Sequence, residues 1–389
     1  MVERRINDFP DDILTHIVSF LPFKDAFKTT VLSKKWVSLC YKLSNLEIND
    51  EGVNNAEDWI HFRRFVDAII LSPHSQNVTL KSFNLRCSSE FVDCDGFDKL
   101  VEAAKQRHVE YLDLCLLNVP LAPSIFCCDT LVVLKLARIR VGTSFNCSAH
   151  LPSLKTLVMF AVFFEDMENC FKLLSGCPKL ECLDTTFIKP GFTIVEANAG
   201  VTERGYFKPL SNLINASIHI RDVPLKALYN VQYLCVTNSR LGKTISDDEI
   251  YSYYKGLPLF GNLTELQLYF RRGIHDWGEV VKMLQKCPKL QALKIVKGFD
   301  STTKENWKYP YDVPECVLSR LTTCNIVGYE AFEHDFQFAT YILQNARLLQ
   351  VMTICNAKYS NPNPVPKPQY LEDLYSCPKI SPACKLSII

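Results

Sequence analysis

Residues 287–295 read Cys-Pro-Lys-Leu-Gln-Ala-Leu-Lys-Ile, and the opening Cys-Pro-Lys-Leu also occurs at residues 177–180. Each copy follows a stretch that is able to form a helix, at residues 166–175 and 277–286. Proline lacks the backbone N–H that continues a helix. Each junction therefore predicts the end of one helix and the start of a new repeat.

The segment that follows the junction belongs to a pattern that recurs along the chain: an apolar residue, two others, an apolar residue, one other and an apolar residue. Instances begin at Val109, Leu131, Leu154, Leu180, Leu213, Val231, Leu263 and Leu290, and two weaker ones begin at Leu321 and Leu349. Successive starts are 18 to 33 residues apart, which brackets the period of about 20–29 residues of leucine-rich repeats.

These segments resemble irregular leucine-rich repeats. The resemblance implies an α/β solenoid in which each short strand buries alternate residues and shows the others on a concave sheet. An unrelated α/β fold is the alternative, because the apolar pattern by itself is a weak signal. Residues 49–55 are predicted to be a linker. The apolar stripe within residues 59–70 predicts a helix that caps the solenoid.

A different pattern occupies residues 6–36, which include Ile6-Asn-Asp-Phe-Pro-Asp-Asp-Ile-Leu14, Ser19-Phe-Leu-Pro22 and Leu32-Ser-Lys-Lys-Trp36. Asp8 is expected to cap a first helix with Pro10 in its first turn, and Pro22 to end it. A second helix over residues 24–29 and a third capped by Ser33 follow. About 40 residues cannot bury a self-sufficient core, so part of this apolar surface is expected to face a partner.

This N-terminal string resembles an F-box, with Phe9-Pro10 where the family more often has Leu-Pro. The resemblance implies docking onto a Skp-type adaptor and, through it, onto a cullin. The residues expected to contact the adaptor are Phe9, Pro10, Ile13, Leu14, Ile17, Leu21, Pro22 and Trp36. Some of them must instead pack between the F-box's own helices, and the sequence does not show which residues have which role.

The C-terminal part resembles the FBD module of plant F-box proteins with leucine-rich repeats. The resemblance rests on Trp307, Val313-Pro-Glu-Cys316, Gly328-Tyr329, residues 336–346 and residues 381–386. Asp335 suits the N-terminal end of the helix expected there. The module is predicted to cap the solenoid. A dedicated binding role is the alternative, although no unusual polar cluster marks it in the sequence. The predicted domains are an F-box over residues 1–48, the solenoid with its capping helix over residues 56–300, and an FBD-like module over residues 301–389.

Composition and the lack of certain motifs argue against several classes of function. A formal net charge of +1 argues against a nucleic-acid partner. No apolar run is long enough to span a bilayer, so a membrane partner is not expected either. The 17 cysteines contain no C-x-x-C pair, which favours buried free thiols over a metal site. Catalytic motifs are also missing. The chain is therefore predicted to be a non-catalytic protein without cofactors, located in the cytoplasm or nucleus.

The three resemblances together imply the substrate-recognition subunit of a Skp–cullin–F-box ubiquitin ligase, which holds an unknown protein target close to the conjugating enzyme. The solenoid register predicts target contacts at Tyr111, Asp113, Ser217, His219, Arg221, Tyr233, Glu265, Gln267, Tyr269 and Lys294, with the insertions at residues 188–208 and 242–257 as further candidates. A solvated sheet face is the alternative for any one of these residues. A ligand-dependent sensor and a scaffold that does not promote degradation are the alternative functions.

Overall fold

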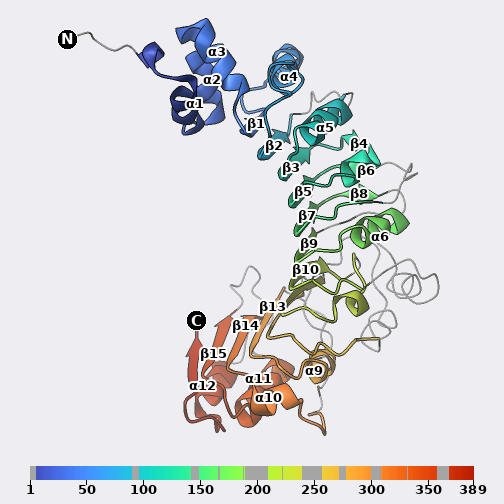
Figure 1. Ribbon diagram of the computed structural model, residues 1–389. Coiled ribbons are helices and arrows are strands. Elements are labelled where there is room, and N and C mark those ends of the chain that lie inside the picture. The colour runs from blue at the N-terminus through green and yellow to red at the C-terminus, as the bar shows by residue number, and fades with distance from the viewer. Residues whose placement is uncertain are drawn as a thin grey trace. The chain divides into compact units, whose positions relative to one another are not determined.

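The computed structural model describes residues 6–89, 96–141, 149–164, 167–186, 188, 209–220, 222–238, 256–270, 277–298, 307, 309–330, 332–356 and 368–389 (Figure 1). The chain forms two compact units. One consists of Met1–Leu180 and Phe187–Pro190, and the other of Glu181–Thr186 and Gly191–Ile389. Both are built from parallel strands and helices, which confirms the predicted α/β class.

The first unit begins with three short helices: α1 (Asp11–Ser19), α2 (Phe23–Lys28) and α3 (Lys34–Tyr41). The prediction that Asp8 caps α1 is wrong, because Asp8 ends a separate 3-10 turn (Ile6–Asp8) and Pro10 occupies the N-cap position. The extended backbone of Pro10 (φ −56°, ψ 151°) separates the turn from the helix. Ser33 occupies the N-cap position of α3 as expected, although its side chain makes no capping hydrogen bond.

The sheet of the first unit is parallel and follows the chain in the order β1 (Asn45–Asn49), β2 (Ser82–Cys87), β3 (Tyr111–Leu116), β5 (Val133–Ala137) and β7 (Thr156–Phe160). Helices α4 (Ala56–Ile70), α5 (Phe97–Gln106) and α6 (Met167–Ser175) lie to one side of these strands (Figure 1). A small second sheet joins β4 (Pro120–Leu121), β6 (Arg140–Val141) and β8 (Phe163–Phe164), and a 3-10 turn covers Pro123–Phe126.

The predicted linker over residues 49–55 is shorter in the structure. Asn49 is the last residue of β1, and Asn55 is the N-cap of α4, where its side chain accepts a hydrogen bond from the backbone N–H of Asp58 at 2.9 Å. The predicted capping helix is α4, in which Trp59, Val66 and Ile69 are buried.

The second unit contains a parallel sheet in the order β9 (Cys182–Thr186), β10 (Asn215–His219), β11 (Tyr233–Asn238), β12 (Glu265–Phe270), β13 (Ala292–Lys297), β14 (Thr323–Tyr329), β15 (Val351–Asn356) and β16 (Lys385–Ile388). Its helices are α9 (Trp277–Gln285), α10 (Glu315–Ser319), α11 (Glu333–Asn345) and α12 (Pro368–Ser376), with a 3-10 turn at Leu225–Leu228.

Every predicted instance of the apolar pattern overlaps a strand, and the strand register stacks its apolar positions. Leu114 pairs with Leu136 and Leu136 with Met159 in the first unit. In the second unit Leu266 pairs with Leu293, which pairs with Cys324. Because parallel partners carry apolar side chains on the same face, each unit gains a continuous core beneath its sheet.

Strands β1, β2 and β16 were not predicted, although they follow the same apolar pattern. Their positions are Leu43/Leu46/Ile48, Leu80/Phe83/Leu85 and Ala383/Leu386/Ile388. The first triplet lies within residues that the F-box resemblance had claimed, and the last within the FBD-like segment. These two segments were assigned to the F-box and to the FBD module, so β1 and β16 were not recognised as further repeats.

The two Cys-Pro-Lys-Leu junctions close helices, as predicted. The thiol of Cys177 donates to the carbonyl of Leu173 at 3.2 Å at the end of α6, and that of Cys287 donates to Met283 at 3.1 Å at the end of α9. The leucine of each junction then donates its N–H to the cysteine carbonyl, at 3.2 Å in both copies. This short turn directs the chain from the helix into the next strand.

The FBD-like residues extend the sheet of the repeats within the second unit. Strand β14 pairs with β13 from Ala292↔Thr323 to Val296↔Val327. Helix α11, which the sequence predicted from its apolar face, buries Phe338, Ala339 and Ile342. The limits of the three predicted domains stay a prediction.

Candidate functional site

The three F-box helices bury a small core and leave other apolar side chains uncovered. Leu14, Val18, Ala26, Trp36 and Leu39 are at most 2% exposed. On the outside, the exposed fraction is 40% for Phe9, 44% for Ile13, 41% for Ile17, 75% for Phe20, 39% for Leu21, 86% for Val31 and 55% for Leu32. We call these seven side chains the F-box apolar face.

The residues predicted to contact an adaptor fall into a buried group and an exposed group. Leu14 and Trp36 are buried among the F-box helices, and the indole N–H of Trp36 donates to the side-chain oxygen of Asn7 at 2.6 Å. These two residues therefore hold the motif together rather than face a partner. Phe9, Pro10, Ile13, Ile17, Leu21 and Pro22 are exposed, and their contact with an adaptor stays a prediction.

Sequence reasoning missed three members of the F-box apolar face, Phe20, Val31 and Leu32. Phe20 follows the last residue of α1, and the other two lie in the 3-10 turn Thr29–Leu32. Helical periodicity does not extend through a helix end or a turn, so it gives no indication of these three side chains.

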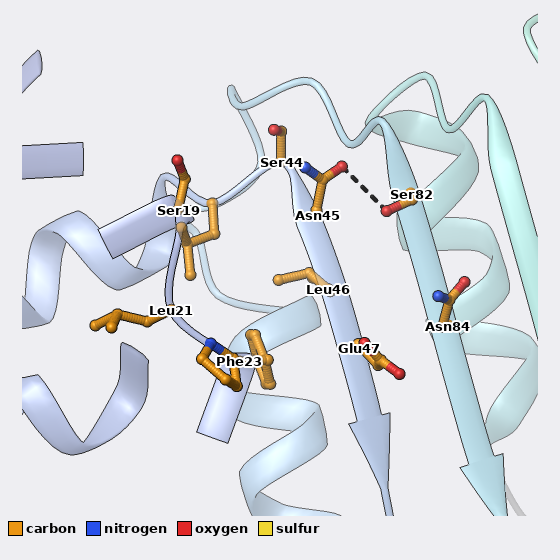
Figure 2. A pocket seen from close by; sticks show the side chains of 11 residues that line it. Ser19, Leu21, Phe23, Ser44, Asn45, Leu46, Glu47, Ser82 and Asn84 are labelled. Carbon is orange, nitrogen blue, oxygen red and sulfur yellow. Dashed lines mark hydrogen bonds between the residues drawn. The ribbon is translucent and has the colours of Figure 1, made fainter. Parts of the chain in front are cut away.

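A cavity of about 220 Å³ lies where the F-box meets the first two strands (Figure 2). Its wall comes from Ser19, Leu21, Pro22 and Phe23 of the F-box, from Leu43, Ser44, Asn45, Leu46 and Glu47 around β1, and from Ser82 and Asn84 of β2. The hydroxyl of Ser82 donates to the side-chain oxygen of Asn45 at 3.0 Å. Glu47 and Asn84 are partners in the strand register, so their side chains share one face of the sheet.

The sheet face of the first unit carries an ion pair that includes the predicted target residue Asp113. Arg86 contacts Asp113 across β2 and β3, with 3.2 Å between Nη2 and Oδ2. The hydrogen bond from Arg86 to Asp113 raises the pKa of the guanidinium. The ammonium of Lys135 lies 5.3 Å from the ring centre of Tyr111. Tyr111 and Asp113 are therefore joined to neighbours on the same face, and their role in target binding stays a prediction.

The sheet face of the second unit carries a chain of hydrogen bonds along β12. Gln267 donates to the carboxylate of Glu265 at 2.7 Å, and the hydroxyl of Tyr269 donates to Gln267 at 3.2 Å. The ammonium of Lys294 lies 5.7 Å from the ring centre of Tyr269. On β11, burial raises the pKa of Tyr233 to about 12. Four of these predicted target residues thus form one connected polar surface.

The remaining predicted target positions differ in their surroundings. Ser217 is half-buried on β10. His219 is only 7% exposed, and its Nδ1 lies 3.9 Å from a carboxylate oxygen of Asp222. Arg221 lies outside the described residues, as do nearly all of the insertions at residues 188–208 and 242–257.

A buried polar cluster joins the end of strand β13 to helix α11, and sequence reasoning missed it. The ammonium of Lys297 lies 2.6 Å and 2.7 Å from the two carboxylate oxygens of Asp335 and 3.6 Å from the carboxylate of Glu330. Asp335 also accepts from the indole N–H of Trp277 at 3.2 Å and from the backbone N–H of Glu330 at 3.2 Å. Lys297 and Asp335 are 38 positions apart, so no local sequence pattern predicts their contact.

His334 lies beside this cluster. Its Nε2 is 3.4 Å from a carboxylate oxygen of Asp335. Burial lowers the pKa of His334, and the charge of Lys297 acts in the same direction, while Asp335 and Glu333 oppose the shift.

Two other kinds of site are not found within the described ranges. Among these residues no group of three or more His, Cys, Asp and Glu side chains is arranged to hold a metal ion. No described helix has both the length and the apolar character needed to cross a membrane.

Three family models match the chain. The F-box domain model matches residues 6–47, the model for the LRR repeats of FBD-associated F-box protein At5g56370 matches residues 97–199, and the FBD model matches residues 309–354. None of these three models describes an enzyme.

Curated relatives match over most of their length. F-box/FBD/LRR-repeat protein At4g26340 of Arabidopsis thaliana is 29% identical over 438 residues, covering 98% of this chain and 99% of the relative. F-box/FBD/LRR-repeat protein At3g52680 of the same plant is 31% identical over 401 residues, covering 91% of this chain and 85% of the relative. A crystal structure of an internalin from Listeria monocytogenes covers 83% of this chain and 92% of its own at 13% identity, but its TM-score of 0.35 is too low to inform function. The chain belongs to the family of F-box/FBD/LRR-repeat proteins.

Proposed function

We propose that this protein is a substrate-recognition subunit of a Skp–cullin–F-box ubiquitin ligase. An F-box domain implies binding to a Skp-type adaptor, and the observation that supports this role here is the F-box apolar face. Fully burying one side chain of this kind is worth about 1.5–3 kcal/mol. Seven of them on so short a motif form a surface suited to a protein partner.

The proposed mechanism is proximity. The F-box end holds the adaptor and, through it, the cullin, while the sheet faces hold a protein target. Binding both raises the effective concentration of target lysines near the conjugating enzyme, so this chain supplies no nucleophile of its own. The connected surface of Glu265, Gln267, Tyr269 and Lys294 is the proposed target contact, together with Tyr233 on the neighbouring strand β11. Aromatic side chains held in place are effective anchors. The proposed location is the cytoplasm or nucleus.

The adaptor contact is tested by pull-down from plant extract with the proteasome inhibited. Baits are the intact chain, a Leu21→Ala, Pro22→Ala variant, and a Leu259→Ala control, whose leucine is 62% exposed in the second unit. Adaptor and cullin should be recovered with the intact chain and the control and lost with the double variant. Failure of the folded intact chain to recover either protein would reject the ligase assignment.

The target contact is tested with the same extract. Proteins recovered by both the intact chain and the Leu21→Ala, Pro22→Ala variant are target candidates, since that variant keeps its sheet faces. Tyr269→Ala and Lys294→Ala should lose such a protein while retaining the adaptor. If target recovery is unchanged in both variants, the β12–β13 surface is not the target contact.

A further inference from the structure

We propose that the cavity between the F-box and strands β1 and β2 receives a lysine or arginine side chain of the Skp-type adaptor. This inference rests on the proposed function, because the adaptor is the partner that would cover the neighbouring F-box apolar face. It adds a contact made by the repeat strands themselves to the contact made by the F-box helices.

The position of the cavity supports the adaptor as its occupant. Leu21 belongs both to the F-box apolar face and to the cavity wall, and Pro22, which is also exposed, lines the cavity next to it. In Figure 2 the F-box segment that carries these residues runs alongside β1. A protein that covers Leu21 and Pro22 therefore also covers part of the cavity wall.

The residues that line the cavity favour a side chain with an apolar chain and a positively charged end. Leu21, Pro22, Phe23 and Leu46 provide apolar surface, while Glu47 is the one charged residue among those that line the cavity. Lysine and arginine bury their methylene groups against apolar surface and place the charged head at a carboxylate. An anionic group would be repelled by Glu47.

The carboxylate of Glu47 and the side-chain oxygen of Asn84 are able to accept further hydrogen bonds. Among the described residues Glu47 forms no salt bridge. Its charge acts on Arg86, one strand away, but the Arg86 guanidinium contacts Asp113 at 3.2 Å instead. The side-chain oxygen of Asn84, the register partner of Glu47, is shielded from solvent and accepts no hydrogen bond from a described residue. A buried acceptor without a donor is unfavourable. A side chain that fills the cavity reaches this oxygen only if the Asn84 amide turns toward it, and the hydrogen bond formed would then offset that cost.

The size of the cavity favours one side chain over a separate ligand. Its volume of about 220 Å³ is below the range of about 300–1,000 Å³ that is usual for small-molecule sites. The cavity is therefore better matched to part of a docked protein than to a ligand that binds independently.

The experiment measures the dissociation constant of the purified full-length chain and a purified Skp-type adaptor at low and high salt. Glu47→Gln should weaken binding about tenfold and Glu47→Lys further, since a charge-assisted contact is lost and then reversed. The weakening should shrink at high salt. Glu110→Lys makes the same charge change at an exposed position outside the cavity and should leave binding within about twofold of the intact chain.

A charge swap identifies the adaptor side chain. Exposed lysines and arginines of the adaptor are changed to glutamate one at a time, and one of them should restore binding to the Glu47→Lys chain. Circular dichroism and the thermal midpoint confirm that each variant is folded.

The outcomes separate this inference from the proposed function. If Leu21→Ala, Pro22→Ala abolishes adaptor binding but Glu47→Lys behaves like Glu110→Lys, the ligase role stands and the cavity contact is rejected. If Glu47→Lys loses a target while the adaptor affinity is unchanged, the cavity belongs to target recognition and the inference is likewise rejected. If the intact chain does not bind the adaptor, both proposals fail.

Discussion

Among the described residues, Lys297 is a charged side chain held almost without contact with water. Its side chain is 2% exposed and that of Asp335 is fully buried, so both charges lose their hydration. Such a pair persists only where the remaining donors and acceptors are satisfied. Here Trp277 and the backbone of Glu330 supply the extra hydrogen bonds to Asp335. The cluster therefore fixes the end of β13 to the first turn of α11.

Replacing Lys297 with methionine should destabilise the second unit by about 3–5 kcal/mol, because the carboxylate of Asp335 is left buried without its cation. Adding Asp335→Asn should recover part of this loss, since the amide oxygen still accepts from Trp277. Urea unfolding, together with hydrogen exchange over residues 333–345, measures the effect. Lys289→Met, at an exposed lysine that donates to Asn262, is the control. Equal stability of the Lys297→Met and Lys289→Met variants would show that the buried pair contributes nothing.

The lowered pKa of His334 predicts a dependence of stability on pH. The unfolded chain, in which the imidazole has its ordinary pKa of 6.5, binds a proton more readily than the folded chain. The contribution of neutral His334 to the free energy of unfolding is therefore fully present above pH 6.5. It is lost as the pH falls below that value toward the lowered pKa of the folded chain. Free energies of unfolding at about pH 5.5 and about pH 7.5 should show a smaller loss for His334→Gln than for the intact chain. His61→Gln, at an exposed histidine, should keep the full dependence.

At the scale of elements, strand β14 contains an irregularity that brings the FBD-like segment to the cluster. Its pairing with β15 shifts between Val327 and Tyr329, and Gly328 between them has a φ of +78°. A Cβ at this position would overlap the carbonyl oxygen of Lys297. Glycine is therefore required twice here, for the backbone conformation and for the close approach of β13.

Gly328→Ala should lower the free energy of unfolding of the second unit by about 1–3 kcal/mol or more, because a left-handed backbone and a steric overlap are both penalised. Gly261→Ala is the matched control, since a Cβ there meets nothing within 4 Å, and its effect should stay within about 0.5 kcal/mol. Urea unfolding of the two variants side by side gives the comparison. Similar stabilities would mean that β14 can pair without the irregularity.

At the scale of the whole molecule, the F-box apolar face should govern behaviour in solution. Phe20 and Val31 are 75% and 86% exposed, and an uncovered surface of this kind promotes association between copies. We expect the free chain to self-associate as its concentration rises and an equimolar Skp-type adaptor to suppress this. Analytical ultracentrifugation measures both effects.

A Phe20→Ser, Val31→Ser variant should sediment as a smaller species than the intact chain at equal concentration. Leu259→Ser, which removes an exposed leucine from the second unit, should leave the sedimentation unchanged. An intact chain that stays monomeric at high concentration would contradict the expectation.

Local periodicity in the sequence determined the class of fold. The apolar pattern placed a strand at each of its instances, and the Cys-Pro-Lys-Leu junctions placed the ends of α6 and α9. These features depend on residues a few positions apart, and so they can be read along the chain. The tertiary structure decided which F-box side chains are covered, how Lys297 meets Asp335, and that Leu21, Glu47 and Asn84 line one cavity. Such arrangements depend on the packing of segments distant in sequence, which no local pattern specifies.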